Sequence, residues 1–239
     1  MSTAPNLVVL SAGAAKGVVE ALAPAFRAET GAVVDATFGA VGTIREQFLA
    51  SDRCDVLILT AAMLDALARE GRVDGGTVAP LGEVATGVAV RAGDPHPPIG
   101  DRAALRDCFA RAEALLCPDT ERATAGIHFV RVLRELGLWP AVESRIRAYP
   151  SGAVAMRALA DAGDPGLVGC TQVTEILYTR GVELVGTLPR EFALATTYSV
   201  AVAARAPRAA LARRFAAVLA GPATRALREG GGFFGATAC

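Results

Sequence analysis

Two side chains in the second half of this 239-residue chain have the chemistry needed for proton transfer. His128 lies in the segment TAGIHFV, just inside a predicted helix, where an imidazole can accept or donate a proton near neutral pH. Glu175 comes shortly after a predicted strand and is a second candidate acid or base. Both have structural alternatives, because a histidine can simply pack against or cap a helix, and a glutamate stabilises a first helical turn. His128 is therefore the first catalytic candidate and Glu175 the second.

The segment LVVLSAGAAKG near the start of the chain suits the binding of an anion. The apolar run 7–10 ends in small residues, and Ser11, Gly13 and Ala14 let a ligand approach the backbone closely. The helix that follows begins with amide N–H groups that lack partners within the helix, and such groups favour an anion. Lys16, the only lysine, stands at this helix start, where a cation costs about 0.3–1 kcal/mol and can be offset by a bound anion. A solvated lysine is the alternative.

Later turns repeat this arrangement of small or polar residues before a helix. The candidate contacts in these turns are Ala40, Val41, Gly42, Thr60, Ala125, Gly126, Ser151, Gly152 and Gln172. Tyr198, on a late strand, is a further candidate, with packing in the strand as its alternative. Thr60 is equally explained as a helix cap. Together these residues predict a set of amide and hydroxyl donors around one small anionic ligand.

Alternating strands and helices position these residues. In the first third, the hydrophobic pattern predicts strands at 7–10, 32–38 and 54–60 and helices at 16–30, 43–51 and 61–70, with 39–42 as a turn. Further on, it predicts strands at 84–91, 114–117, 145–149, 166–170, 182–188 and 196–204, and helices at 102–112, 126–136, 152–161, 173–178, 208–219 and 222–229. Ligands of such sheets bind beyond the carboxyl ends of the strands.

The fold class predicted from this order is α/β with two lobes. Each lobe is a mostly parallel sheet flanked by helices, and a ligand cleft lies between the lobes. Residues 1–84 and 197–239 form the first lobe, and residues 85–196 form the second. Turns at the strand ends would line the cleft.

Composition excludes several classes of protein. The formal net charge is zero, so no basic excess indicates a nucleic-acid partner, and no apolar stretch has the length of a membrane span. The five cysteines form no metal-binding spacing and are expected to be buried thiols, except for an exposed Cys239. We expect no metal and no cofactor. The first residues carry no secretory signal, which predicts a cytoplasmic protein if Met1 is the native start, and a periplasmic one if the sequence was trimmed.

The chain resembles proteins of the type II periplasmic-binding fold, and in particular the small molybdate-binding proteins of ABC uptake systems. The resemblance spans almost the whole chain and rests on LVVLSAGAAKGVVEALAPAFRAETG, TFGAVGTIREQF, DVLILTAAMLDALAREGRV, TAGIHFVRVLRELGL, GCTQVTEI and LAGPATRAL. It is similar in fold also to aconitate isomerase, which shifts a double bond in a small tricarboxylate. These segments are specific for the fold and much less so for the ligand.

The resemblance implies where an anion would bind. In the molybdate-binding proteins, hydroxyls and amides from successive turns hold the anion, and the matching positions here are Ala14, Ala40 or Val41, Ala125, Ser151–Gly152 and Gln172. Alanine or valine replaces two family serines, and Gln172 replaces a tyrosine. Each lost hydrogen bond costs about 1–3 kcal/mol, although Ser11 can restore one. These changes predict a ligand other than molybdate or tungstate.

Two hypotheses follow. The first is a cytoplasmic enzyme that isomerises a small di- or tricarboxylate by proton transfer, as aconitate isomerase does. The second is a non-enzymatic solute-binding protein for an oxyanion or organic acid, with an ABC permease as its partner if the protein is exported. A small anion is the ligand in both.

Overall fold

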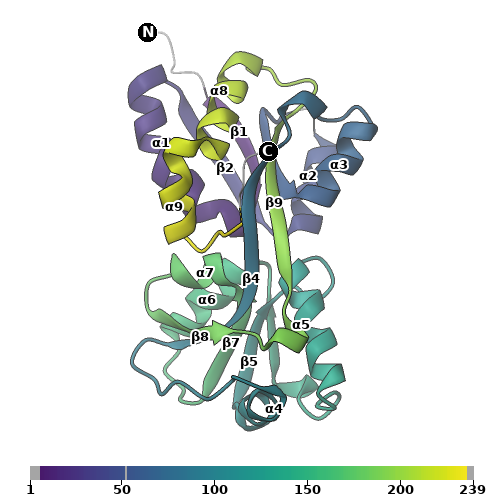
Figure 1. Cartoon of the computed structure of the whole chain (residues 1–239), viewed down its shortest axis with the longest axis vertical. Coiled ribbons are helices and arrows are strands. Elements are labelled where there is room, and N and C mark those ends of the chain that lie inside the picture. The colour runs from purple at the N-terminus through teal and green to yellow at the C-terminus, as the bar shows by residue number, and fades with distance from the viewer. Residues whose placement is uncertain (1–5, 52, 236–239) are drawn as a thin grey trace. The chain divides into compact units, whose positions relative to one another are not determined.

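A computed structural model of the chain describes residues 6–51 and 53–235, and the chain divides into two compact units (Figure 1). Unit 1 comprises residues 1–83 and 196–239, and unit 2 comprises residues 84–195. The predicted lobe boundaries fall one residue later at both places. The expectations for Met1 and Cys239 lie outside the described residues.

Unit 1 is a sheet covered by helices. Its strands are β1 (Asn6–Ala12), β2 (Val33–Gly39), β3 (Val56–Thr60) and β9 (Ala195–Val202), and its helices are α1 (Lys16–Thr30), α2 (Val41–Ala50), α3 (Ala61–Arg69), α8 (Ala209–Ala220) and α9 (Arg225–Gly230). The strand order is β2-β1-β3-β9, in which the first three strands are parallel and β9 is antiparallel to β3. Every residue of β3 before Thr60 is buried, which accounts for its continuous apolar run.

Helix α2 begins earlier than the sequence predicts. The predicted turn covers 39–42, but Val41 and Gly42 are the first two residues of the helix. Ala40 has φ −60° and ψ 143° and stands at the N-cap, and the Ile44 amide donates to its carbonyl at 2.9 Å. The prediction failed because an alanine N-cap carries none of the usual side-chain signal. As a result, two of the predicted ligand contacts lie in a first helical turn rather than in a loop.

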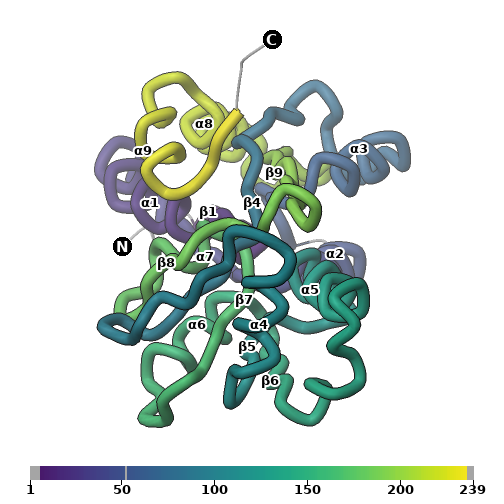
Figure 2. The backbone as a smooth tube through the Cα atoms, turned by 60° about the horizontal axis from the view of Figure 1, so that its bottom comes forward, coloured from purple at the N-terminus to yellow at the C-terminus, as the bar shows by residue number. Residues whose placement is uncertain are grey.

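Unit 2 is built on a mixed sheet. From residue 84 onward it contains β4 (Ala79–Arg91), β5 (Ala114–Pro118), β6 (Ile146–Tyr149), β7 (Leu167–Gln172) and β8 (Val182–Thr187), with helices α4 (Arg102–Arg111), α5 (Thr124–Glu135), α6 (Gly152–Asp161) and α7 (Val173–Leu177). Strand β5 pairs in parallel with β6 and β7, and these strands lie side by side in Figure 2. Strand β4 is antiparallel to both β7 and β8. The parallel part of the sheet is therefore β6-β5-β7.

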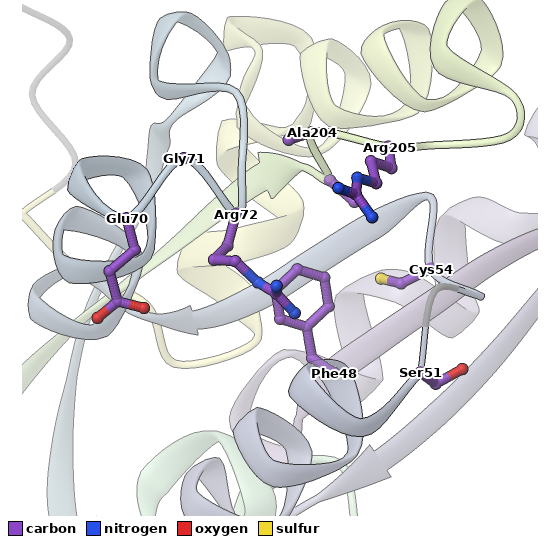
Figure 3. Close-up of a pocket in the computed structure, with 9 residues that line it drawn as sticks. Phe48, Ser51, Cys54, Glu70, Gly71, Arg72, Ala204 and Arg205 are labelled. Atoms are coloured by element: carbon purple, nitrogen blue, oxygen red, sulfur yellow. The ribbon is translucent and has the colours of Figure 1, made fainter.

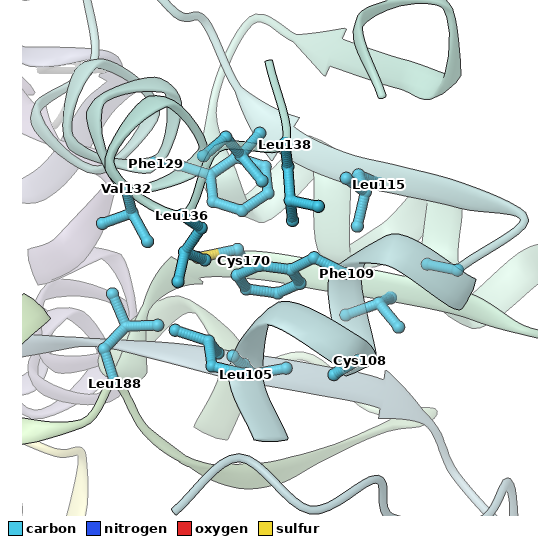
Figure 4. Packing of buried hydrophobic residues seen from close by; sticks show 14 of the residues in the cluster. Leu105, Cys108, Phe109, Leu115, Phe129, Val132, Leu136, Leu138, Cys170 and Leu188 are labelled. Carbon is cyan, nitrogen blue, oxygen red and sulfur yellow. The ribbon is translucent and has the colours of Figure 1, made fainter. Parts of the chain in front are cut away.

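The core of unit 2 packs α4 and α5 against this sheet (Figure 4). Phe109 of α4 and Phe129 of α5 meet edge to face, with ring centroids 5.2 Å apart and an interplanar angle of 83°. Cys108, Cys117 and Cys170 lie in the same cluster. The aromatic pair joins α4 to α5 within the core that packs both helices against the sheet.

The described cysteines are buried, as the sequence predicts. Burial raises the pKa of Cys54 and Cys117 to about 12 and that of Cys108 to about 11. A thiol with such a pKa has almost no reactive thiolate at pH 8. In a Cys239→Ser background, we expect the four remaining thiols to react with a thiol-specific reagent at least ~100-fold more slowly than a free thiol until the protein is unfolded. Fast labelling of the folded protein would contradict this.

Candidate functional site

The topology of unit 1 brings most of its predicted contacts to one edge. Ala12 of β1 lies opposite Gly39 of β2, so the turns that follow these two strands are neighbours. β3 pairs with β1 and ends at Thr60, at the same carboxyl edge. We call the following residues edge group 1: Gly13, Ala14, Lys16, Ala40, Val41, Gly42 and Thr60.

The helix starts of edge group 1 differ in their capping. Thr60 caps α3, because its Oγ1 accepts a hydrogen bond from the Met63 amide at 3.4 Å. No side chain caps α2, whose N-cap is Ala40, or the 3-10 turn Gly13–Ala15 that precedes α1. Ala14 and Ala40 are 4 % and 5 % exposed. Buried amide groups at such helix starts need partners, and an anion is a suitable one.

Lys16 is the first residue of α1 and keeps about a third of its side chain exposed. Its Nζ lies 3.8 Å from Glu20 Oε1 and 5.8 Å from the centroid of the Phe38 ring. The ammonium group is therefore partly balanced by a glutamate on the next turn of the same helix. It remains the one cation within edge group 1.

Two predicted ligand contacts of unit 1, Ser11 and Tyr198, are buried in the structure. Ser11 has no exposed surface, and its hydroxyl donates to the Ala12 carbonyl at 2.9 Å. The hydroxyl proton is therefore used within the chain, and the expected role of Ser11 as a substitute ligand hydroxyl stays a prediction. Tyr198 is 2 % exposed and lies opposite Thr60 in the β3–β9 ladder, as the packing alternative predicts.

Unit 2 collects its predicted contacts in the same way. Pro118 of β5 lies opposite Tyr149 of β6, and β7 pairs with the other side of β5. The helices that follow these three strands therefore start along one edge. We call the following residues edge group 2: Ala125, Gly126, His128, Ser151, Gly152, Gln172 and Glu175.

Helix α5 starts two residues before the predicted position, and no side chain caps it. Ala125 and Gly126 are buried in its first turn. A Cβ atom on Gly126 would lie 2.2 Å from the Asp119 carbonyl oxygen and 2.5 Å from that of Pro118. The loop before α5 thus packs directly on the helix backbone, which only glycine allows here.

The start of α6 is occupied by the chain's own groups. Glu175 is 5 % exposed, and its Oε2 accepts a hydrogen bond from the Thr171 hydroxyl at 2.6 Å. The backbone amides of Ala153, Gln172 and Gly152 also hydrogen-bond to this carboxyl group. Burial raises the pKa of Glu175 above its usual value, and these four donors oppose that rise. Sequence reasoning missed Thr171, whose type and position in a buried strand carry no catalytic signal.

His128 is half-buried, one turn into α5. Its Nε2 lies 2.8 Å from the carbonyl oxygen of Phe192, in the 3-10 segment Arg190–Phe192. Because a carbonyl only accepts, we assign the proton to Nε2, which leaves Nδ1 as the basic nitrogen of the neutral ring. The predicted base is therefore also a structural link, and any proton transfer would have to use Nδ1. Gln172, the N-cap of α7, is 3 % exposed.

The pocket in Figure 3 lies in unit 1 and does not contain the predicted residues. It has a volume of about 180 Å³, and Phe48, Cys54, Arg72 and Arg205 are among its lining residues. These residues precede β3, follow α3 or follow β9, so they lie at the amino end of β3. Within residues 6–51 and 53–235, we find no cluster of three His, Cys, Asp or Glu side chains that could hold a metal. The same ranges contain no helix with the length and hydropathy of a bilayer span.

Comparisons with known proteins identify the family. A model of the bacterial extracellular solute-binding protein family matches residues 7–234. An aconitate isomerase from a Pseudomonas species is 28 % identical over 236 residues, which cover 95 % of this chain and 87 % of that protein.

Among solved structures, the periplasmic molybdate-binding protein of Azotobacter vinelandii superposes with a TM-score of 0.78 at 19 % identity, covering 97 % of this chain and all of that one. The sulfate-binding protein SubI of Mycobacterium tuberculosis H37Rv has a TM-score of 0.71 at 20 % identity, with coverage of 96 % and 86 %. These structures share the α/β fold of type II periplasmic-binding proteins. The chain therefore belongs to the bacterial extracellular solute-binding protein family.

Proposed function

We propose that this chain binds a small organic anion that carries two or three carboxylates. One observation carries the proposal: α2 and α5 start at the carboxyl edges of their sheets with buried residues and no side-chain cap. Buried amide donors in such turns are well suited to carboxylate oxygens. Edge group 1 and edge group 2 are the candidate contacts, and substitutions in each test them separately.

The residue types at these helix starts favour a carboxylate over an inorganic oxyanion. Ala14, Ala40 and Ala125 offer backbone amides and methyl groups but no hydroxyl. A ligand with a carbon skeleton can use the methyl groups, whereas a tetrahedral oxyanion needs a hydrogen bond for each oxygen. The likeness to a Pseudomonas aconitate isomerase supports the same ligand class.

We further propose that the chain isomerises this carboxylate. The reaction removes a proton from a carbon next to a carboxylate, moves the double bond along the allylic system, and returns a proton to the far carbon. Atoms and electrons balance without an oxidant or cofactor. Amide donors would stabilise the enolate-like charge that develops, and His128 Nδ1 is the candidate proton carrier. A cytoplasmic location accompanies this hypothesis.

A non-catalytic receptor is the second candidate, and the family match supports it. Such a protein would bind an organic acid or oxyanion and deliver it to an ABC permease, which requires a periplasmic location. The sulfate- and molybdate-binding structures that share its fold support an anionic cargo in this case too.

Thermal unfolding in the presence of candidate ligands tests the binding proposal. We expect cis-aconitate, trans-aconitate or citrate at about ten times its dissociation constant to raise the melting temperature by roughly 2–4 °C. Molybdate, tungstate and sulfate at equal ionic strength are the controls. Stabilisation by micromolar molybdate, with none by the carboxylates, would overturn the proposal.

Proton NMR in D₂O then separates enzyme from receptor. An isomerase is expected to interconvert cis- and trans-aconitate with incorporation of deuterium, and His128→Ala should lower the rate at least ~100-fold. His96→Ala is the matched control, because His96 is exposed and pairs with Glu183. Binding without conversion would favour the receptor, and full activity in His128→Ala would remove the proposed role of His128.

A further inference from the structure

The first turn of α6 has a partner within the chain for each of its amides. The Gly152 and Ala153 amides hydrogen-bond to the Glu175 carboxyl group. The Val154 amide donates to Ser151 Oγ at 3.4 Å, and the Ala155 amide donates to the Ser151 carbonyl at 3.0 Å. No first-turn donor of α6 remains for a ligand.

The carboxyl group of Glu175 lies in close contact with the backbone at the start of α6. A Cβ atom on Gly152 would lie 1.9 Å from Glu175 Oε2 and 2.0 Å from Thr171 Oγ1, so the carboxylate rests directly on the helix backbone. Thr171 has no exposed surface, and its hydroxyl donates to the carboxyl group. The Gln172 amide, at the N-cap of α7, completes the set. All four partners are donors, which matches a carboxylate rather than a carboxylic acid.

We propose that the start of α6 is a carboxylate-binding site whose resident ligand is the side chain of Glu175. Glu175 is then a positioning residue that joins α6 to α7, and it does not act as the catalytic base. The site recognises a planar carboxylate through two amides of α6, the Gln172 amide that precedes α7, and the Thr171 hydroxyl. An external formate or acetate ion has the same chemistry.

Because Glu175 occupies the start of α6, fewer backbone amides of unit 2 are left for a ligand. In α5, the Ala125 and Gly126 turn has no side-chain cap, whereas the α6 turn already holds an anion. Of the starts of α5 and α6, only that of α5 therefore keeps amides for a ligand, a consequence that rests on the proposed function. A second anionic group next to the Glu175 charge would be repelled.

Chemical rescue tests the resident carboxylate. Glu175→Ala removes the side chain and leaves a cavity lined by donors, so its melting temperature should fall well below that of the wild type. Sodium formate at about ten times its dissociation constant should then raise the melting temperature of this variant by roughly 2–4 °C more than it raises that of the wild type. Formamide, a neutral molecule of similar shape, should not. Glu121→Ala is the matched control, because Glu121 is an exposed glutamate of the same unit.

Two results would overturn the proposal: equal formate shifts in Glu175→Ala and the wild type, or equal melting temperatures for Glu175→Ala and Glu121→Ala. Should Glu175→Ala fail to fold alone, recovery of folded protein in formate but not in formamide supports the site, and no difference between them counts against it. Glu175→Gln fills the cavity and should show no formate shift. These measurements need no carboxylate substrate, so their outcome does not depend on whether the proposed function is correct.

Discussion

Replacing Gly126 with alanine is expected to lower the free energy of unfolding by about 3 kcal/mol, the upper end of the cost of overpacking. The added Cβ would stand 2.2 Å and 2.5 Å from two carbonyl oxygens of the preceding loop. That loop cannot move away easily, because Asp119 Oδ1 accepts hydrogen bonds from the Glu121 and Arg122 amides at 2.8 and 2.9 Å. The clash is with backbone atoms, so no side-chain rotation relieves it. Urea unfolding followed by circular dichroism measures the loss.

Gly163→Ala is the control for this substitution. Gly163 belongs to the same unit and has no heavy atom within 4 Å of the position of an added Cβ. Its replacement should change the free energy of unfolding by no more than about 0.5 kcal/mol. If Gly126→Ala were as stable as Gly163→Ala, the contact between the loop and the first turn of α5 would be wrong.

A carboxylate introduced at the start of α2 is expected to weaken the binding of an organic anion at least ~100-fold. In Ala40→Asp, the new side chain stands at the N-cap and accepts from the amides that we assign to the ligand. Two like charges about 4 Å apart repel by about 4 kcal/mol at an effective dielectric constant near 20. A 100-fold loss of affinity corresponds to only about 2.7 kcal/mol. The new carboxylate caps the helix, which offsets part of the cost of burying a charge at a position that is 5 % exposed.

Ala209→Asp provides the same change of charge elsewhere in unit 1. Ala209 is the exposed first residue of α8, which follows β9 at the opposite edge of the sheet from Ala40. Calorimetric titration with the best ligand from the thermal screen should give unchanged affinity for this control. Unchanged affinity in Ala40→Asp would exclude the start of α2 from the binding site.

The sequence predicts those elements whose ends carry local signals. Helix α1 ends where predicted, because Gly31 adopts the left-handed conformation, with φ +73°. Helix α6 has the predicted bounds, because Ser151 caps it. Helices α2 and α5 begin two residues early, since Ala40 and Ala123 offer no capping group to recognise.

The residues of the candidate site also fall into two sets, those that a general rule predicts and those that depend on long-range contacts. Residues of the two edge groups were predicted to face a ligand because the carboxyl ends of parallel strands meet at one edge, a rule of topology. The partner of His128 is 64 residues away, in the 3-10 segment Arg190–Phe192. The glutamate at the start of α6 comes from another helix, and its burial depends on a glycine. Such long-range contacts leave no local pattern in the chain.

The close contact at Gly152 has a consequence for how relatives of this protein can vary. Glu175, Thr171 and Gly152 constrain one another, since the carboxylate leaves room for no side chain at residue 152. A homologue that has lost the glutamate at position 175 can carry another residue in place of Gly152, whereas a homologue that keeps the glutamate cannot. Substitutions at these three positions should therefore be correlated during evolution, and the order of change should matter, with the acid lost before the glycine.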